Sequence, residues 1–77
     1  MIEFKLTSRD GSKSYYKFAG TGLHGIIVID TITLESDFSE VDGFLKDNEQ
    51  EKQKLLYIAR RKLKSLDFPE SCIYATH

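Results

Sequence analysis

Residues 48–66 read NEQEKQKLLYIARRKLKSL and carry the one long helical pattern of this chain. In a helix of 3.6 residues per turn, the apolar side chains of this stretch fall within an arc of about 100°. These side chains are Leu55, Leu56, Ala59, Leu63 and Leu66. Asn48 followed by Glu51 is typical of a helix start, and Pro69 closes the helical region because it disfavours helical geometry in the residue before it. An arc of this kind must pack against a partner surface.

Three strand-like runs precede the helix and can supply that surface. The first alternates apolar and polar residues over residues 2–7, which is the period of a half-buried strand. The second, over residues 13–19, places Tyr16 and Phe18 on one face. Its other face carries Lys13, Tyr15 and Lys17. Asp10-Gly11 between the two runs is typical of a tight hairpin turn.

The third run contains four consecutive β-branched residues, Ile26, Ile27, Val28 and Ile29, and then alternates up to residue 35. A continuous apolar run usually marks a strand that is covered on both sides. One helix covers one side only, so the other side needs a second cover. Two alternatives are open: the segment 36–48, whose apolar residues have near-helical spacing, or a second protein chain.

The predicted fold is a single small α+β domain over residues 1–77 with element order β-β-β-α. It has a three-stranded antiparallel sheet and one main helix packed on one face. Residues 71–75 are a possible short fourth strand after the helix. At 77 residues the chain can bury only about 60–65% of its unfolded surface, which gives a thin core and makes help from a partner chain plausible.

The composition excludes several classes of protein. Eleven Lys and Arg against twelve Asp and Glu give a net charge of −1, so the chain as a whole has no bias toward nucleic acid or anionic lipid. No apolar run approaches the roughly 20 residues of a membrane span, and residues 1–6 lack the features of a signal peptide. Cys72 is the one cysteine, which favours a reducing compartment. We expect a cytoplasmic protein.

Two groups of side chains are candidate binding surfaces. The outer side of the helix carries Tyr57, Arg60, Arg61 and Lys64 at i, i+3, i+4 and i+7, a pattern that can bind phosphates and stack on a base. The same pattern is also that of an ordinary solvated helix face. The candidate protein interface consists of Tyr15, Ile26, Ile27, Val28 and Ile29, with Tyr15 as the natural anchor.

Catalytic, cofactor and metal sites are not predicted. The glycine-rich stretch 20–25 lacks the following helix of a phosphate loop, because β-branched residues come next. The soft or imidazole ligands are His24, Cys72 and His77 alone, and their spacing defines no catalytic arrangement. A third reading, a hydrolase, would need a cleft that holds His24 near a carboxylate.

The sequence therefore favours a non-enzymatic protein that acts by protein–protein interaction, either as a homodimer or as an accessory or regulatory partner of a larger protein. The alternative is weak nucleic-acid binding through the basic helix face. No cofactor, membrane or small-molecule substrate is inferred.

Overall fold

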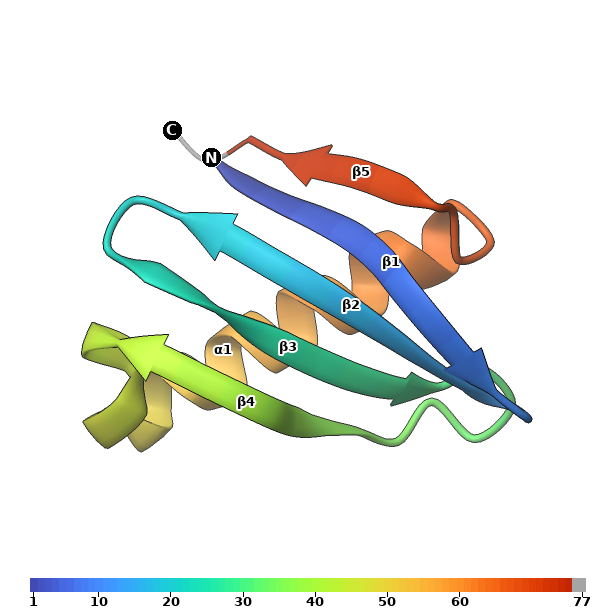
Figure 1. Cartoon of the computed structure of the whole chain (residues 1–77), viewed down its shortest axis with the longest axis horizontal. Coiled ribbons are helices and arrows are strands. Elements are labelled where there is room, and N and C mark those ends of the chain that lie inside the picture. Colours follow the sequence, from blue (N-terminus) through green and yellow to red (C-terminus); the bar gives the residue numbers. More distant parts are fainter. Residues whose placement is uncertain (76–77) are drawn as a thin grey trace.

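A computed structural model describes residues 1–75 of the chain, apart from the side chain of Phe44. Five strands form one antiparallel sheet in the order β4-β3-β2-β1-β5, and the helix α1 crosses one face of it (Figure 1). The elements are β1 (Ile2–Asp10), β2 (Lys13–Gly20), β3 (Leu23–Asp30), β4 (Ser36–Gly43), the 3₁₀ helix η1 (Phe44–Asp47), α1 (Glu49–Ser65) and β5 (Ser71–Tyr74). The predicted α+β class is confirmed, whereas the predicted number of three strands is wrong.

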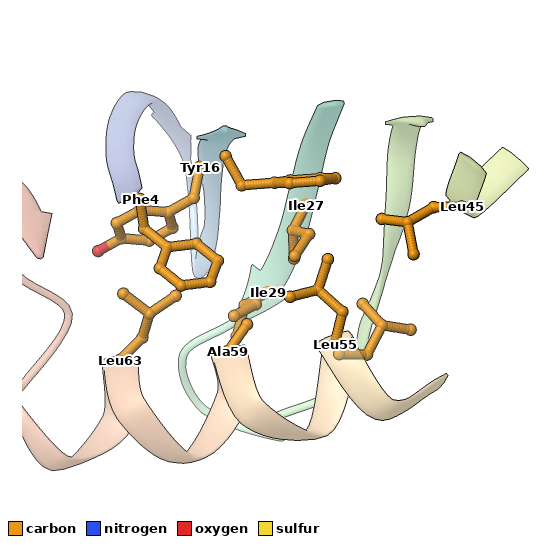
Figure 2. Packing of buried hydrophobic residues seen from close by; sticks show 10 residues of the cluster. Phe4, Tyr16, Ile27, Ile29, Leu45, Leu55, Ala59 and Leu63 are labelled. Atoms are coloured by element: carbon orange, nitrogen blue, oxygen red, sulfur yellow. The ribbon is translucent and has the colours of Figure 1, made fainter. Parts of the chain in front are cut away.

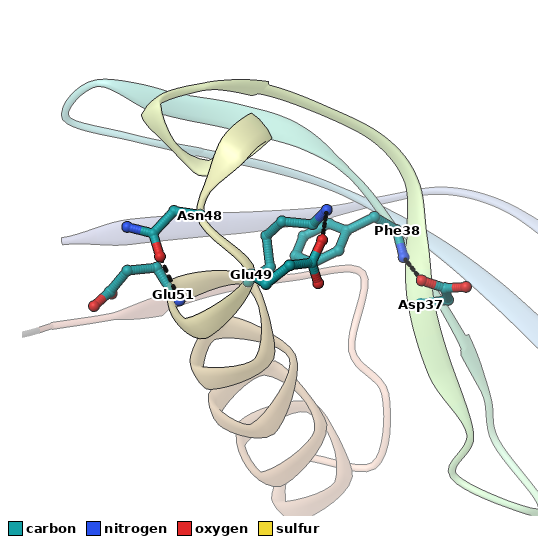
Figure 3. A network of polar contacts seen from close by, with 6 residues as sticks. Asp37, Phe38, Asn48, Glu49 and Glu51 are labelled. Carbon is teal, nitrogen blue, oxygen red and sulfur yellow. Dashed lines mark hydrogen bonds and ion pairs between the residues drawn. The ribbon is translucent and has the colours of Figure 1, made fainter.

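Helix α1 begins where the sequence indicates. The side-chain oxygen of Asn48 accepts a hydrogen bond from the backbone N–H of Glu51 at 3.2 Å, which caps the helix (Figure 3). Beside this cap, the Lys52 ammonium lies 2.8 Å from a Glu49 carboxylate oxygen. The helix ends at Ser65, so Leu66 falls at the C-cap and is 47% exposed, outside the apolar arc to which the sequence assigns it.

The core lies between α1 and the side of the sheet that faces it (Figure 2). The sheet contributes Phe4, Tyr16, Phe18, Ile27 and Ile29, and the helix contributes Leu55, Leu56, Ala59 and Leu63. Tyr16 is fully buried, and its hydroxyl donates a 2.6 Å hydrogen bond to the carbonyl of Pro69, which ties the loop after α1 to the sheet. Burial raises the pKa of this hydroxyl.

Segment 36–48 does not cover the second face of the sheet. Residues 36–43 form β4, which extends the sheet at its edge beside β3. A β-bulge explains the misleading pattern: Phe38 pairs with Ile27 while Glu40 pairs with Ile26, so Ser39 is an extra residue. The bulge puts Phe38 and Val41 on the same side of the sheet although they are three residues apart, a spacing that resembles that of a helix.

The predicted extension of the third strand through residue 35 is also wrong. The Asp30 carboxylate accepts hydrogen bonds from the backbone N–H groups of Ile32, at 2.8 Å, and Thr33, at 3.0 Å. These bonds bend the chain away from β3, and Leu34 adopts a φ of 67°. They also hold the pKa of Asp30 below its usual value.

The possible C-terminal strand is present as β5, which pairs with β1 through residues 71–74. His77 lies outside the described residues.

Candidate functional site

The side of the sheet opposite α1, called the outer face below, is a surface that the fold leaves open. Within residues 1–75, no helix or loop lies over it, because α1 crosses the other side and β4 lies in the plane of the sheet (Figure 1). Alternation along each strand decides which side chains point there. Lys5, Lys13, Tyr15, Lys17, Ile26 and Val28 occupy this face, since their neighbours Phe4, Ser14, Tyr16, Phe18, Ile27 and Ile29 are buried toward α1.

The strand register places the outer-face side chains in rows that run across the sheet. Two of these rows cross the middle of the sheet. From β1 to β4, the first row consists of Ser8, Tyr15, Val28 and Asp37. From β5 to β4, the second row consists of Ser71, Lys5, Lys17, Ile26 and Glu40. Tyr15, Ile26 and Val28 form an apolar strip at the centre of these rows and are partly exposed. Charged residues flank the strip on both sides.

This arrangement keeps part of the predicted protein interface and removes part of it. Tyr15, Ile26 and Val28 are together on the outer face, because Tyr15 pairs with Val28 and Ile26 is two residues from Val28 on the same strand. Ile27 and Ile29 are 0% exposed under α1, so they belong to the core and not to an interface. The four consecutive β-branched residues predicted a strand that is covered on two apolar sides. Within residues 1–75, only the side that faces α1 is covered.

The basic side of α1 is a second candidate surface, and the structure brings most of it together. The Tyr57 ring is flanked by two guanidinium groups, whose central carbons lie 6.0 Å (Arg60) and 5.7 Å (Arg61) from the ring centroid. The Nη1 of Arg61 also lies 3.4 Å from the Tyr57 hydroxyl, to which it donates. Lys64 is exposed one turn further along the helix and is not part of this cluster.

A shallow hollow of about 370 Å³ beside this cluster was not predicted from the sequence. Its lining consists of Tyr57, Ile58, Arg61, Lys62, Ser65 and Tyr74. Tyr74 reaches it because β5 pairs with β1 at the sheet edge beside the second half of α1. No sequence pattern indicated which edge of the sheet β5 would join, so the second tyrosine of this surface could not be placed.

His24 and Cys72 have ordinary surroundings. His24 lies on the outer face near the start of β3, where its Nε2 is 3.5 Å from an Asp42 carboxylate oxygen, and both side chains are more than half exposed. Within residues 1–75 no hydroxyl or thiol is hydrogen-bonded to this histidine. The half-buried Cys72 packs against the core, and burial raises the pKa of its thiol. In the described part of the chain, no group of three or more His, Cys, Asp or Glu side chains could hold a metal ion.

Comparisons of this chain with protein-family models, with curated proteins and with solved structures find no match. Among residues 1–75, no helix has the length and apolar character that crossing a membrane requires.

Proposed function

We propose that this chain is a small non-enzymatic domain that acts by binding another protein through its outer face. The observation that carries this proposal is the apolar strip of Tyr15, Ile26 and Val28, over which no element of the described chain lies. Burying such a strip against a partner removes apolar surface from water, which drives most protein association. Tyrosine at its centre fits the residue preference of interface hot spots.

The charges around the strip also support a protein partner. Interfaces commonly combine an apolar centre with a polar rim. The outer face has this layout, because the strip is bordered by lysines on β1 and β2 and by carboxylates on β4. A single cysteine favours a reducing compartment, so we place this interaction in the cytoplasm.

Val28→Lys tests this proposal because it puts a charge at the centre of the strip without disturbing the core. The new ammonium would lie beside Asp37, its register partner on β4, so we expect the fold to tolerate it. We expect the variant to retain about one tenth or less of the bound protein that the wild type retains, since a charged group would replace an apolar side chain at the centre of the interface.

The measurement is quantitative retention by the immobilised chain, with extract from the native host and a tagged copy of the chain itself as the two sources of partner. Ile32→Lys is the matched control, because Ile32 is 80% exposed in the turn before β4 and the change adds the same charge outside the outer face. Equal retention by the wild type, Val28→Lys and Ile32→Lys would refute the role of the outer face.

Weak nucleic-acid binding is the second candidate function. It is favoured by the cluster of Tyr57, Arg60 and Arg61 and by the adjacent hollow that Tyr74 and Lys62 help to line. Guanidinium groups and tyrosine rings at one place can contact both phosphates and bases. The net charge of −1 gives no general attraction, so any affinity depends on this local surface and falls steeply with salt.

Charge reversal at Arg61 tests this candidate. At low salt we expect a fluorescently labelled single-stranded oligonucleotide to bind the wild type weakly, and Arg61→Glu to abolish the change in fluorescence anisotropy. Lys17→Glu makes the same charge change on the outer face, outside the cluster. We expect its affinity to stay within about twofold of that of the wild type, because only residues that contact a phosphate contribute to the affinity. The absence of binding to the wild type at low salt, or an equal loss in both variants, would eliminate this function.

A further inference from the structure

The charges of the outer face are divided between two halves of the sheet. The basic half, on β1 and β2, carries Lys5, Lys13 and Lys17. The acidic half, on β4, carries Asp37, Glu40 and Asp42. Glu3 and Asp10, toward the two ends of β1, are the exceptions to this division. The apolar strip runs between the two halves, so the face is positive on one side of the strip and negative on the other.

The pairing of the two central lysines is unfavourable in the isolated chain. Lys5 and Lys17 are register partners on adjacent strands, and like charges directly opposite each other destabilise a sheet. In the described part of the chain, neither lysine has an ion-pair partner, and neither does Glu40 on the acidic half. A surface that brings a carboxylate to Lys5 and an ammonium group to Glu40 therefore relieves two unpaired charges at once.

We propose that a second copy of this chain binds the outer face, related to the first by a two-fold axis that runs parallel to the strands between β2 and β3. This inference rests on the proposed function and names its partner. Rotation about the axis puts β2 over β3 and β1 over β4 of the other copy, and each residue keeps its level along the strand. Lys5 then lies over Glu40 of the partner subunit, and Tyr15 over Val28 of the partner subunit. Because of the two-fold symmetry, each of these contacts occurs twice in the dimer.

The charge pattern also disfavours a two-fold axis along β2. A two-fold axis along β2 itself would put Lys17 over Lys17 of the partner subunit, which repeats the repulsion already present in the sheet. With the axis between β2 and β3, Lys17 lies over Ile26 of the partner subunit, so its aliphatic stem covers the strip while its ammonium reaches the rim. The same axis also places Lys13 over Asp30 of the partner subunit, whereas Glu3 lies over Asp42 of the partner subunit and opposes the contact.

The size of the face predicts a weak homodimer. Four strands about 4.8 Å apart, each rising about 3.3 Å per residue over roughly eight residues, span about 500 Å² of flat sheet. A stable protein interface buries about 800 Å² on each partner. We therefore expect a weak homodimer, with a dissociation constant on the order of micromolar, in which complementary charges fix the register of the two copies.

Paired charge reversals test both the partner and the axis. Lys5→Glu alone puts two like-charged pairs of carboxylates in the dimer, and Glu40→Lys alone puts two like-charged pairs of ammonium groups there. We expect either change to raise the homodimer dissociation constant at least about tenfold. Mixing the two variants yields a heterodimer in which a carboxylate faces an ammonium group at both symmetry-related contacts. We expect the dissociation constant of this heterodimer to return to within about threefold of that of the wild type.

The measurement is energy transfer between donor-labelled and acceptor-labelled copies over a concentration series. Lys54→Glu, an exposed change on α1, is the control for net charge and is expected to dimerise like the wild type. A wild type that stays monomeric, or single reversals that do not weaken the dimer, would overturn the proposed dimer. Either result would leave the outer face open to a different protein partner, which the retention experiment with Val28→Lys addresses separately.

Discussion

Ile27→Ala is expected to lower the free energy of unfolding by about 2–5 kcal/mol, because it deletes three buried carbons from a packed core and leaves a cavity. Ile27 is 0% exposed and lies at the centre of the cluster between the sheet and α1. A chain of 77 residues has a total stability of about 4–12 kcal/mol, so this one change removes a large part of it. Urea unfolding followed by far-UV circular dichroism, in dilute protein, measures the loss.

The neighbouring residue provides a matched control for this prediction. Ile26→Ala is the same chemical change on the next residue of β3, but Ile26 points to the outer face and is partly exposed. We expect it to cost about 1–2 kcal/mol in the monomer, less than Ile27→Ala, because Ile26 is only partly buried by the chain itself. Equal losses at the two positions would mean that the chain covers both sides of the sheet, and the interface would then have no basis.

Gly25→Ala is expected to destabilise the fold by about 1–3 kcal/mol or more, because the added carbon has no room. A Cβ at this position would come within 2.3 Å of the Glu40 carbonyl oxygen and 2.8 Å of a ring carbon of Phe18. The close approach of the two strands here follows from the bulge at Ser39 in β4. Thermal and urea unfolding of the variant measure the effect.

Gly11→Ala is the control for this prediction, because it also replaces a glycine but adds its Cβ at a position with no steric clash. Gly11 has a φ of 62° in the hairpin between β1 and β2, and a Cβ there would meet no atom within 4 Å. Its substitution is expected to cost about 1–2 kcal/mol through backbone strain alone. A smaller loss of unfolding free energy for Gly25→Ala than for Gly11→Ala would contradict the close approach of β3 and β4 at the bulge.

The parts of the fold that the sequence predicts are those whose patterns repeat without interruption. Alternation in β1 and β2, the arc of leucines in α1 and the Asn48 cap each persist over several residues, and the structure has them where they were expected. Strand β4 was missed because its bulge changes the side-chain period from two to three between Phe38 and Val41. A bulge depends on the partner strand, so no local pattern reveals it.

The turn after β3 was missed for a different reason. Thr31, Ile32, Thr33 and Leu34 alternate like a strand, but the carboxylate of Asp30 binds two backbone N–H groups and ends β3. Asp at this position competes with the sheet for the same hydrogen bonds. The apolar alternation was therefore a weaker signal than the single acidic residue before it.

The sequence predicts the positions of the candidate interface residues only in part. Tyr15 and Val28 lie on the outer face, because strand alternation puts them on the opposite side of the sheet from Tyr16 and Ile27. Ile27 and Ile29 were included because a β-branched run was read as apolar on both sides, and only the position of α1 shows which side is core. The division of charge across the face depends on β4, so the sequence alone could not reveal it.

The most direct test of dimerisation through the outer face is sedimentation equilibrium of the wild type beside Val28→Lys, from low to high micromolar concentration. If the strip of Tyr15, Ile26 and Val28 binds a second copy, the weight-average mass of the wild type rises toward twice the chain mass, while that of Val28→Lys remains at the monomer value. Superimposable mass profiles for the two proteins would contradict it.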